Sequence, residues 1–163
     1  MVMWEKAAAN LGINADPQQF DRLAEWVGER DGMVFSSDDQ TVATLFFEAV
    51  SDCQTLHSML HEMVRELRSE GFDVVGLDLD LVNTTDIADR SGRTRQTVRQ
   101  YAEGVRGPGG FPAPLGAPGG VRVWDWGSVN EWLRAFDGSG DPEYHPTREF
   151  VAEFNSSLTK SLC

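Results

Sequence analysis

Two short segments on either side of Gly92 restrict the fold of this chain more than any other feature of its sequence. The first, Thr84 to Ser91, follows Asn83, whose side chain is suited to accept a hydrogen bond from the first turn of a helix. Asp86, three residues after Asn83, resembles the partner residue of a capping box. We therefore predict a short helix here, with Gly92 supplying a tight turn, because glycine takes a positive φ without steric cost.

A second short helix is predicted after this turn, from Arg95 to Glu103, with Thr94 as its cap and Gly104 at its end. The side chains at its packing positions are Val98, Tyr101 and Ala102. Two short helices separated by about three residues around a glycine are the minimum arrangement that places one helix in the major groove of DNA. The sequence therefore indicates a helix-turn-helix.

The side chains that point outward from the second helix suit contact with nucleic acid. Arginine can donate two hydrogen bonds to guanine, and glutamine can pair with adenine. We therefore expect base contacts from the first turn, at Arg95, Gln96 and Thr97. One turn later, Arg99 and Gln100 are placed to contact backbone phosphates. The positive end of the helix also favours a nearby phosphate.

The net charge of −12 opposes nucleic-acid binding if the chain is taken as a whole, because an acidic surface repels phosphates. The charge is unevenly distributed, however. Residues 1–83 contain 16 acidic and 5 basic side chains, whereas residues 84–136 contain 5 acidic and 7 basic ones. Four of those seven arginines lie within ten residues of each other: Arg90, Arg93, Arg95 and Arg99. The acidity therefore belongs to the flanking segments.

The first eighty residues have the pattern of a small α+β domain. Helical periodicity is present in Pro17 to Arg30 and, most clearly, in Asp52 to Glu70. Strands are expected at Met33 to Ser36, Thr41 to Val50 and Phe72 to Leu77. This order of elements is that of a ferredoxin-like α/β sandwich. The segment Trp4 to Leu11, where the first strand of such a fold belongs, favours a helix instead.

A third helical pattern follows the predicted helix-turn-helix. Its apolar positions, which are expected to cover the core of the module, are Val129, Trp132, Leu133 and Phe136. Residues 137–147 have the composition of a linker, and a short helix is expected from Thr147 to about Phe154. We therefore expect an acidic α+β domain at residues 1–80, a DNA-binding module at 81–137, and a linker with a short helical tail at 138–163.

The predicted module resembles the winged helix-turn-helix of MerR-like and AlpA/excisionase-like DNA-binding proteins. The resemblance covers about residues 82–136, a third of the chain. It begins with Asn83-Thr84-Thr85-Asp86-Ile87-Ala88 and Gly92-Arg93-Thr94-Arg95-Gln96-Thr97-Val98. It continues with Gly110-Phe111-Pro112-Ala113-Pro114, and it ends with Val123-Trp124-Asp125-Trp126 and Ser128-Val129-Asn130-Glu131-Trp132-Leu133.

The resemblance implies roles for particular residues. The recognition helix would be residues 95–103, and its contacts would come from Arg95, Gln96, Thr97, Arg99 and Gln100, with Arg93 and Thr94 just before it. A wing at residues 105–124 would have Arg106 and Arg122 on its two sides and glycines at its tip. The tip would touch the DNA backbone or the minor groove.

Catalytic and metal sites are weakly supported. Cys53, His57 and His61 share one helix, but they drift around it because each residue turns about 100°. Arg65 stands where a zinc-protease motif beginning at His61 needs its second histidine. The second cysteine, Cys163, forms no CxxC pair with Cys53. Because no phosphate-binding glycine loop or Ser/His/Asp set stands out either, we expect no enzyme, no metal and no cofactor.

The tryptophans and the apolar segments of the chain bear on two further kinds of partner, single-stranded nucleic acid and a membrane. Trp124, Trp126 and Trp132 could stack on single-stranded nucleic acid, but their position beside a helical apolar stripe favours a core. The chain contains no run of eighteen apolar residues, and its beginning lacks the layout of a signal peptide. We therefore expect a cytoplasmic protein with no membrane partner.

The leading expectation is a sequence-specific protein that binds double-stranded DNA, most simply a homodimeric transcriptional regulator. One short recognition helix reads few base pairs, and two-fold pairing doubles the site. The acidic domain would then serve dimerisation or bind a protein partner. One alternative is an excisionase-like architectural factor that bends DNA. Another is an acidic protein–protein interaction module with no role on DNA.

Overall fold

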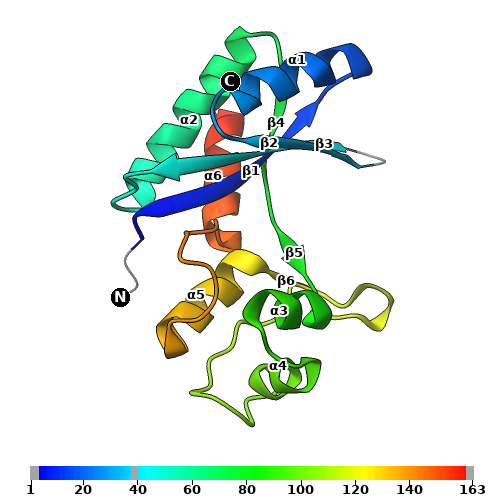
Figure 1. Ribbon diagram of the computed structural model, residues 1–163, viewed down its shortest axis with the longest axis vertical. Helices are drawn as coiled ribbons and strands as arrows, with labels where there is room; N and C mark the ends of the chain where they lie inside the picture. Colours follow the sequence, from blue (N-terminus) through cyan, green and yellow to red (C-terminus); the bar gives the residue numbers. More distant parts are fainter. Residues whose placement is uncertain (1–3, 38–39, 161–163) are drawn as a thin grey trace. The chain divides into compact units, whose positions relative to one another are not determined.

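The computed structural model of the chain describes residues 4–37 and 40–160, and it divides the chain into two units. One contains Trp4–Asp78 and residues 149–160, and we call it the sheet unit. The other contains Leu79–Arg148, and we call it the helical unit. The chain therefore leaves the sheet unit, builds the helical unit, and returns (Figure 1).

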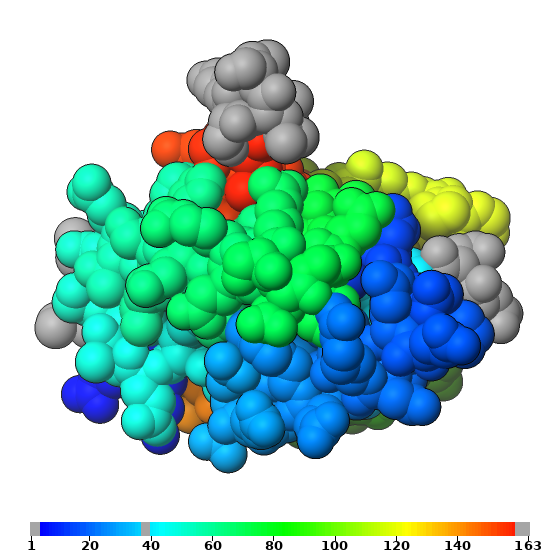
Figure 2. Space-filling view, turned by 90° about the horizontal axis from the view of Figure 1, so that it is seen from above, coloured from blue at the N-terminus to red at the C-terminus, as the bar shows by residue number. Residues whose placement is uncertain are grey.

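The sheet unit is a mixed α+β structure around a four-stranded antiparallel sheet. The strands stand in the order β2-β3-β1-β4. Helices α1 and α2 lie on the same face of the sheet (Figure 1), and their outer surfaces lie side by side in Figure 2. In chain order the elements are β1 (Lys6–Asn14), α1 (Pro17–Gly28), β2 (Met33–Ser37), β3 (Gln40–Glu48), α2 (Cys53–Ser69) and β4 (Asp73–Asp78).

The expected helix at Trp4 to Leu11 is wrong, because this segment forms most of β1. The strand pairs with β3 on one side and β4 on the other. Both of its faces are largely buried, including Ala7, Ala8 and Ala9. Alanine favours a helix in isolation, but hydrogen bonding to two neighbouring strands and burial override that preference. From the sequence we also expect a turn at Ser37-Asp38-Asp39 between the two strands that follow α1, but Asp38 and Asp39 lie outside the described residues.

The two helices predicted in the sheet unit are confirmed. Asp16 accepts a hydrogen bond from the backbone N–H of Gln19 and forms a capping box at the start of α1. Asp52 caps α2 in the same manner, through the N–H of Thr55. The apolar stripe of α2 faces the sheet, with its buried positions at Leu56, Leu60, Val64 and Leu67. Local capping signals and a regular stripe thus fix both helices.

A last helix, α6 (Arg148–Lys160), is longer than the helix expected from Thr147 to about Phe154. The Asn155 side chain donates to the backbone carbonyl of Leu77 at 2.9 Å and accepts from the Leu77 N–H at 2.8 Å. It therefore bonds to β4 as the backbone of a neighbouring strand would. Because β4 is an edge strand, this contact satisfies backbone groups that would otherwise be open to pairing.

Replacing Asn155 by Ala should lower the free energy of unfolding by about 1–3 kcal/mol, because it leaves the N–H and C=O of Leu77 without these partners. The measurement is denaturant unfolding followed by circular dichroism. Ser156→Ala, on the exposed side of the same helix, is the matched control. Equal stability of the two variants would contradict the role given to Asn155.

The helical unit begins with the predicted pair of short helices. Helix α3 (Thr84–Ser91) starts with a capping box between Asn83 and Asp86, and it ends at Gly92, whose φ is 67°. Helix α4 (Arg95–Ala102) starts at the Thr94 cap. These predictions are confirmed. A short strand pair, β5 (Leu81–Val82) with β6 (Trp124–Asp125), and helix α5 (Trp126–Asp137) complete the unit.

The core of the helical unit lies between these elements. Its buried residues are Val82, Ile87, Ala88, Val98, Trp124, Trp126, Val129 and Leu133. The tryptophans at 124 and 126 are fully buried, and Trp132 packs at the border of this core. Phe136, which was expected to cover the core, is 38% exposed. The indole groups therefore belong to the core rather than to an exposed stacking surface.

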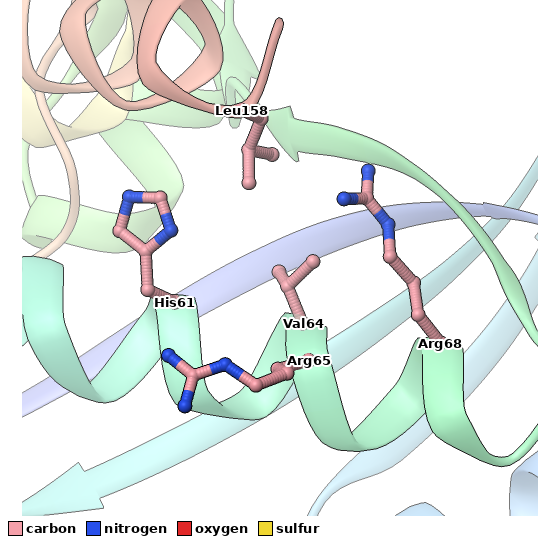
Figure 3. A pocket seen from close by; sticks show the side chains of 5 residues that line it. All are labelled: His61, Val64, Arg65, Arg68 and Leu158. Atoms are coloured by element: carbon pink, nitrogen blue, oxygen red, sulfur yellow. The ribbon is translucent and has the colours of Figure 1, made fainter. Parts of the chain in front are cut away.

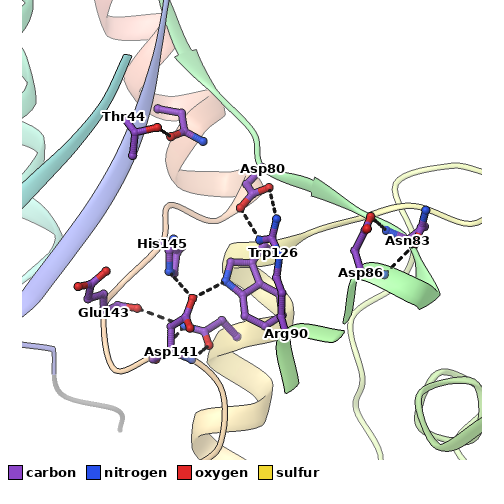
Figure 4. Close-up of polar contacts among 11 residues, drawn as sticks. Thr44, Asp80, Asn83, Asp86, Arg90, Trp126, Asp141, Glu143 and His145 are labelled. Carbon is purple, nitrogen blue, oxygen red and sulfur yellow. Dashed lines mark hydrogen bonds and ion pairs between the residues drawn. The ribbon is translucent and has the colours of Figure 1, made fainter. Parts of the chain in front are cut away.

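Residues 137–147, whose composition is that of a linker, are held against α5. The buried side chain of Asn130 donates to the carbonyls of Asp141 and Glu143 and accepts from the Asp141 N–H. The Asp141 carboxylate in turn accepts from Trp126 Nε1 at 3.1 Å and lies 3.0 Å from His145 Nε2 (Figure 4). The helical unit consequently extends to Arg148.

Replacing Trp124 by Ala should lower the free energy of unfolding of the helical unit by about 3–5 kcal/mol, because a fully buried ring leaves a large cavity. The Trp124 indole N–H, which donates to Pro112 O at 2.9 Å, is lost as well. Thermal and denaturant unfolding measure the loss. Phe136→Ala is the control, because its ring is already partly in water. A Trp124→Ala protein that is no less stable than this control would contradict the core assignment.

Candidate nucleic-acid interface

The outward face of α4 has the composition expected from the sequence. Arg95, Gln96 and Arg99 are exposed, whereas Thr97 and Gln100 are partly buried. The opposite face packs inward through Val98 and Tyr101. Because residues three and four apart share one side of a helix, Arg95 and Arg99 lie on the same side of α4. This helix therefore presents two arginines and an amide side chain to the solvent.

A hollow of about 440 Å³ lies beside this face. It is lined by three segments, namely the beginning of α3, the outer side of α4, and the loop just before β6. The lining residues are Asn83, Thr84, Thr85, Arg95, Arg99, Gly120, Val121 and Arg122. Three of them are arginines and none is acidic. The hollow is therefore suited to a negatively charged group.

The first turn of α3 adds to this character. Backbone N–H groups at the start of a helix have no partner within the helix, and the helix dipole makes that end positive. Thr84 and Thr85, the first two residues of α3, line the hollow. These threonines were not among the residues predicted to contact DNA. The signal was present in the Asn83 cap, because helix N-termini commonly hold phosphates.

The segment between α4 and β6 is not one long wing over residues 105–124. Its first part is held against α5 and β6, because Trp132 Nε1 of α5 donates to Gly109 O at 3.0 Å and Trp124 Nε1 of β6 donates to Pro112 O. Only residues 115–123 form a small hairpin, in which the Leu115 N–H donates to Val123 O at 2.8 Å. The second side of this hairpin, from Gly120 to Arg122, borders the hollow.

The arginines of the helical unit fall into two groups. Arg90, Arg93 and Arg148 form ion pairs with Asp80, Asp137 and Asp125, and Arg134 donates to the carbonyl of Gly138. In contrast, Arg95, Arg99, Arg106 and Arg122 have no carboxylate within ion-pair distance among the residues that the structure describes. All four arginines of the second group were predicted to contact DNA, but Arg93, which was predicted to do so as well, belongs to the first group.

The pairing of Arg90 with Asp80 illustrates the first group (Figure 4). Burial of the Arg90 guanidinium opposes its charge, but the hydrogen bond and the negative charge of Asp80 outweigh this effect and raise its pKa above the ordinary value. The same guanidinium lies over the ring of Trp126, 5.2 Å from its centroid. Arg90 therefore covers the buried ring of Trp126 at the edge of the core and is held there by Asp80.

Arg93 has a structural position that the sequence did not reveal. Its guanidinium forms an ion pair with Asp137 and donates to Tyr101 Oη at 3.1 Å and Ser139 Oγ at 2.9 Å. Hydrogen bonds from Ser139 lower the pKa of Asp137, and the charge of Arg93 adds to this effect. Arg93 thus ties the turn between α3 and α4 to the end of α5, and its side chain is committed to those contacts.

Arg106 lies against α4 rather than apart from it. Its guanidinium donates to Thr97 Oγ1 at 3.3 Å and reaches Gln100 Oε1 at 3.5 Å. The Thr97 hydroxyl also lies 3.0 Å from that of Thr94. Four of the predicted contact residues, Thr94, Thr97, Gln100 and Arg106, are therefore linked by side-chain contacts. Three others, Arg95, Arg99 and Arg122, line the hollow.

Other kinds of site receive no support from the described part of the chain. Within residues 4–37 and 40–160, no three His, Cys, Asp or Glu side chains gather in a way that could hold a metal ion. Cys53 is exposed and free, whereas Cys163 lies outside the described residues. None of the described helices combines the length and apolar character needed to cross a membrane.

Comparisons with models of protein families, with curated protein sequences and with solved structures gave no match for this chain.

Proposed function

We propose that the helical unit is a winged helix-turn-helix module that binds double-stranded DNA, with α4 as its recognition helix. The observation that carries this proposal is the hollow beside α4, where Arg95, Arg99 and Arg122 meet the beginning of α3 without any acidic lining residue. Positive side chains that lack internal ion pairs keep their charge available for phosphates. Three other arginines of the unit, Arg90, Arg93 and Arg148, are paired with aspartates.

In the proposed complex, the first turn of α4 enters the major groove. Arg95 and Gln96 are exposed there, and they are the side chains best suited to bind guanine and adenine edges. Arg99, Arg122 and the first turn of α3 contact the phosphates on either side of the groove. The hairpin tip around Gly120 lies against the backbone. The first turn of α4 thus reads the bases, and the residues of the hollow position the module on the DNA backbone.

Few charges are available for this task, which limits binding to DNA of arbitrary sequence. Arg95, Arg99, Arg106 and Arg122, which form no ion pair among the described residues, supply the electrostatic attraction, whereas residues 1–83 carry a large acidic excess. A single module of this kind is weak, and two copies on one site gain both affinity and specificity. We therefore propose a homodimeric, cytoplasmic transcriptional regulator.

We infer a ferredoxin-like fold for the sheet unit, because its antiparallel strand order β2-β3-β1-β4 and its βαββαβ chain order fit that arrangement. In the proposed regulator this unit provides the contact between protomers or with a protein partner. Its acidic charge also keeps it away from DNA, so that the α4 face is favoured during an encounter.

Replacing Arg95 or Gln96 by Ala should relax sequence preference and weaken binding to the preferred site by about 1–3 kcal/mol per lost base contact. The measurement has two steps, both with the full chain. Selection from a random or genomic DNA library gives the preferred site, and fluorescence anisotropy then gives the affinities. Lys6→Ala, which removes one charge from an exposed position of the sheet unit, is the control. Unchanged selected sequences for both α4 variants would contradict the docking of α4 in the major groove.

Replacing Arg122 by Ala should weaken binding to all sequences alike and reduce the slope of log affinity against log salt concentration by about one unit. The reason is that a phosphate contact releases counterions but reads no base. Titrations at several salt concentrations, with a specific and an unrelated duplex, measure both effects. A loss confined to the specific duplex would instead make Arg122 a base-reading residue, and an unchanged slope would remove it from the interface.

A further inference from the structure

A second hollow lies in the sheet unit, between α2 and α6, with a volume of about 240 Å³. Its lining consists of His61, Val64, Arg65, Arg68 and Leu158. In Figure 3, Leu158 on α6 points toward α2, His61, Val64 and Arg68 point toward α6, and the Arg65 side chain extends along α2 below His61. The DNA-binding proposal makes no use of this hollow.

The charge of this hollow is opposite to that of the unit around it. Residues 1–83 have only five basic side chains against sixteen acidic ones, and two of the five, Arg65 and Arg68, line this space. No lining residue is acidic. Among the described residues, neither arginine has a carboxylate within ion-pair distance. Arg68 makes one longer hydrogen bond, at 3.3 Å, to the carbonyl of Val74.

His61 supplies a third nitrogen-bearing side chain. Its Nε2 lies 2.8 Å from Ser157 Oγ, and that hydroxyl also lies 2.6 Å from the carbonyl of Phe154, to which it donates. Because the hydroxyl proton is used on Phe154, Nε2 must donate to Ser157. Burial lowers the pKa of His61, and the positive charges of His57, Arg65 and Arg68 lower it further. The region therefore has an excess of positive potential that no carboxylate of the hollow compensates.

The remaining lining is aliphatic. Val64 and Leu158 are both buried, and they form an apolar wall beside the two guanidinium groups. A ligand that fits must therefore combine one anionic group with a short hydrocarbon part. The volume is below the range of about 300–1,000 Å³ that is usual for drug-sized ligands, so the ligand is small.

We propose that the hollow between α2 and α6 binds a small organic carboxylate, with its anionic group on Arg65 and Arg68 and its hydrocarbon part against Val64 and Leu158. Arginine suits this task because its planar guanidinium donates two parallel hydrogen bonds to a carboxylate. The site is independent of DNA binding, and it gives the sheet unit a ligand of its own.

The test uses the full chain without DNA and the probes acetate, butyrate, inorganic phosphate and neutral butanol, followed by isothermal titration calorimetry and by NMR of the histidine rings. Butyrate should bind saturably and about tenfold more tightly than acetate, since each buried methylene adds to affinity. Phosphate and butanol should bind more weakly than butyrate, because each lacks one of the two features that the hollow recognises. Absence of saturable butyrate binding would overturn the proposal, and so would phosphate binding as tightly as butyrate.

Matched variants locate the site. Arg65→Ala, at an exposed position that affects folding little, should weaken butyrate binding about tenfold or more, as expected for a lost charge-assisted bond. Arg68→Ala should do the same, whereas Arg30→Ala, which removes one arginine elsewhere in the sheet unit, should not. Equal losses for Arg30→Ala and Arg65→Ala would reduce the effect to net charge and overturn the assignment.

The His61 ring gives a readout that a purely structural role of the arginines would not produce. A carboxylate bound beside it favours the charged imidazolium, so saturating butyrate should raise the pKa of His61 in an NMR titration. His145, in the helical unit, should titrate as it does without butyrate. A His61 pKa that is unchanged at saturation would place the bound butyrate outside this hollow and overturn the proposal.

Discussion

One buried carboxylate holds the helical unit together at both of its ends. Asp125 is fully buried, and a charge in such a place is tolerated only when it is paired and hydrogen-bonded. It accepts from the Ser128 N–H at the start of α5, and from the N–H and Nε of Arg148 at the end of the unit. Its backbone pairs with Leu81, near the beginning of the unit. Asp125 thus helps to fix the position of α5 and of both ends of the helical unit.

Ion pairing likewise distinguishes the arginines that stabilise the helical unit from those proposed to bind DNA. Aspartates pair with Arg90, Arg93 and Arg148, whereas Arg95, Arg99 and Arg122, which form no ion pair among the described residues, line the hollow beside α4. A protein with a net charge of −12 can therefore still present a locally positive face. In the sheet unit the hollow between α2 and α6 repeats this pattern on a smaller scale, with two arginines in acidic surroundings.

Local signals in the sequence were enough to predict α3, Gly92 and α4, because caps and a glycine turn act within a few residues. The same is true of the outward face of α4. Features that depend on distant partners were not predictable. Strand β1 needs two neighbours to override its alanines, and Arg93 meets Asp137, 44 residues away. The packing of residues 137–147 depends on the buried Asn130.

The return of the chain to the sheet unit changes what a truncation would remove. Deleting everything after Arg148 takes away the helix that satisfies the β4 edge through Asn155, and an uncovered edge strand invites pairing with another chain. The helical unit, in contrast, begins and ends beside Asp125, so its two ends are close together. The helical unit is thus an insertion between β4 and α6. Another module with adjacent ends can replace it while α6 still covers the β4 edge.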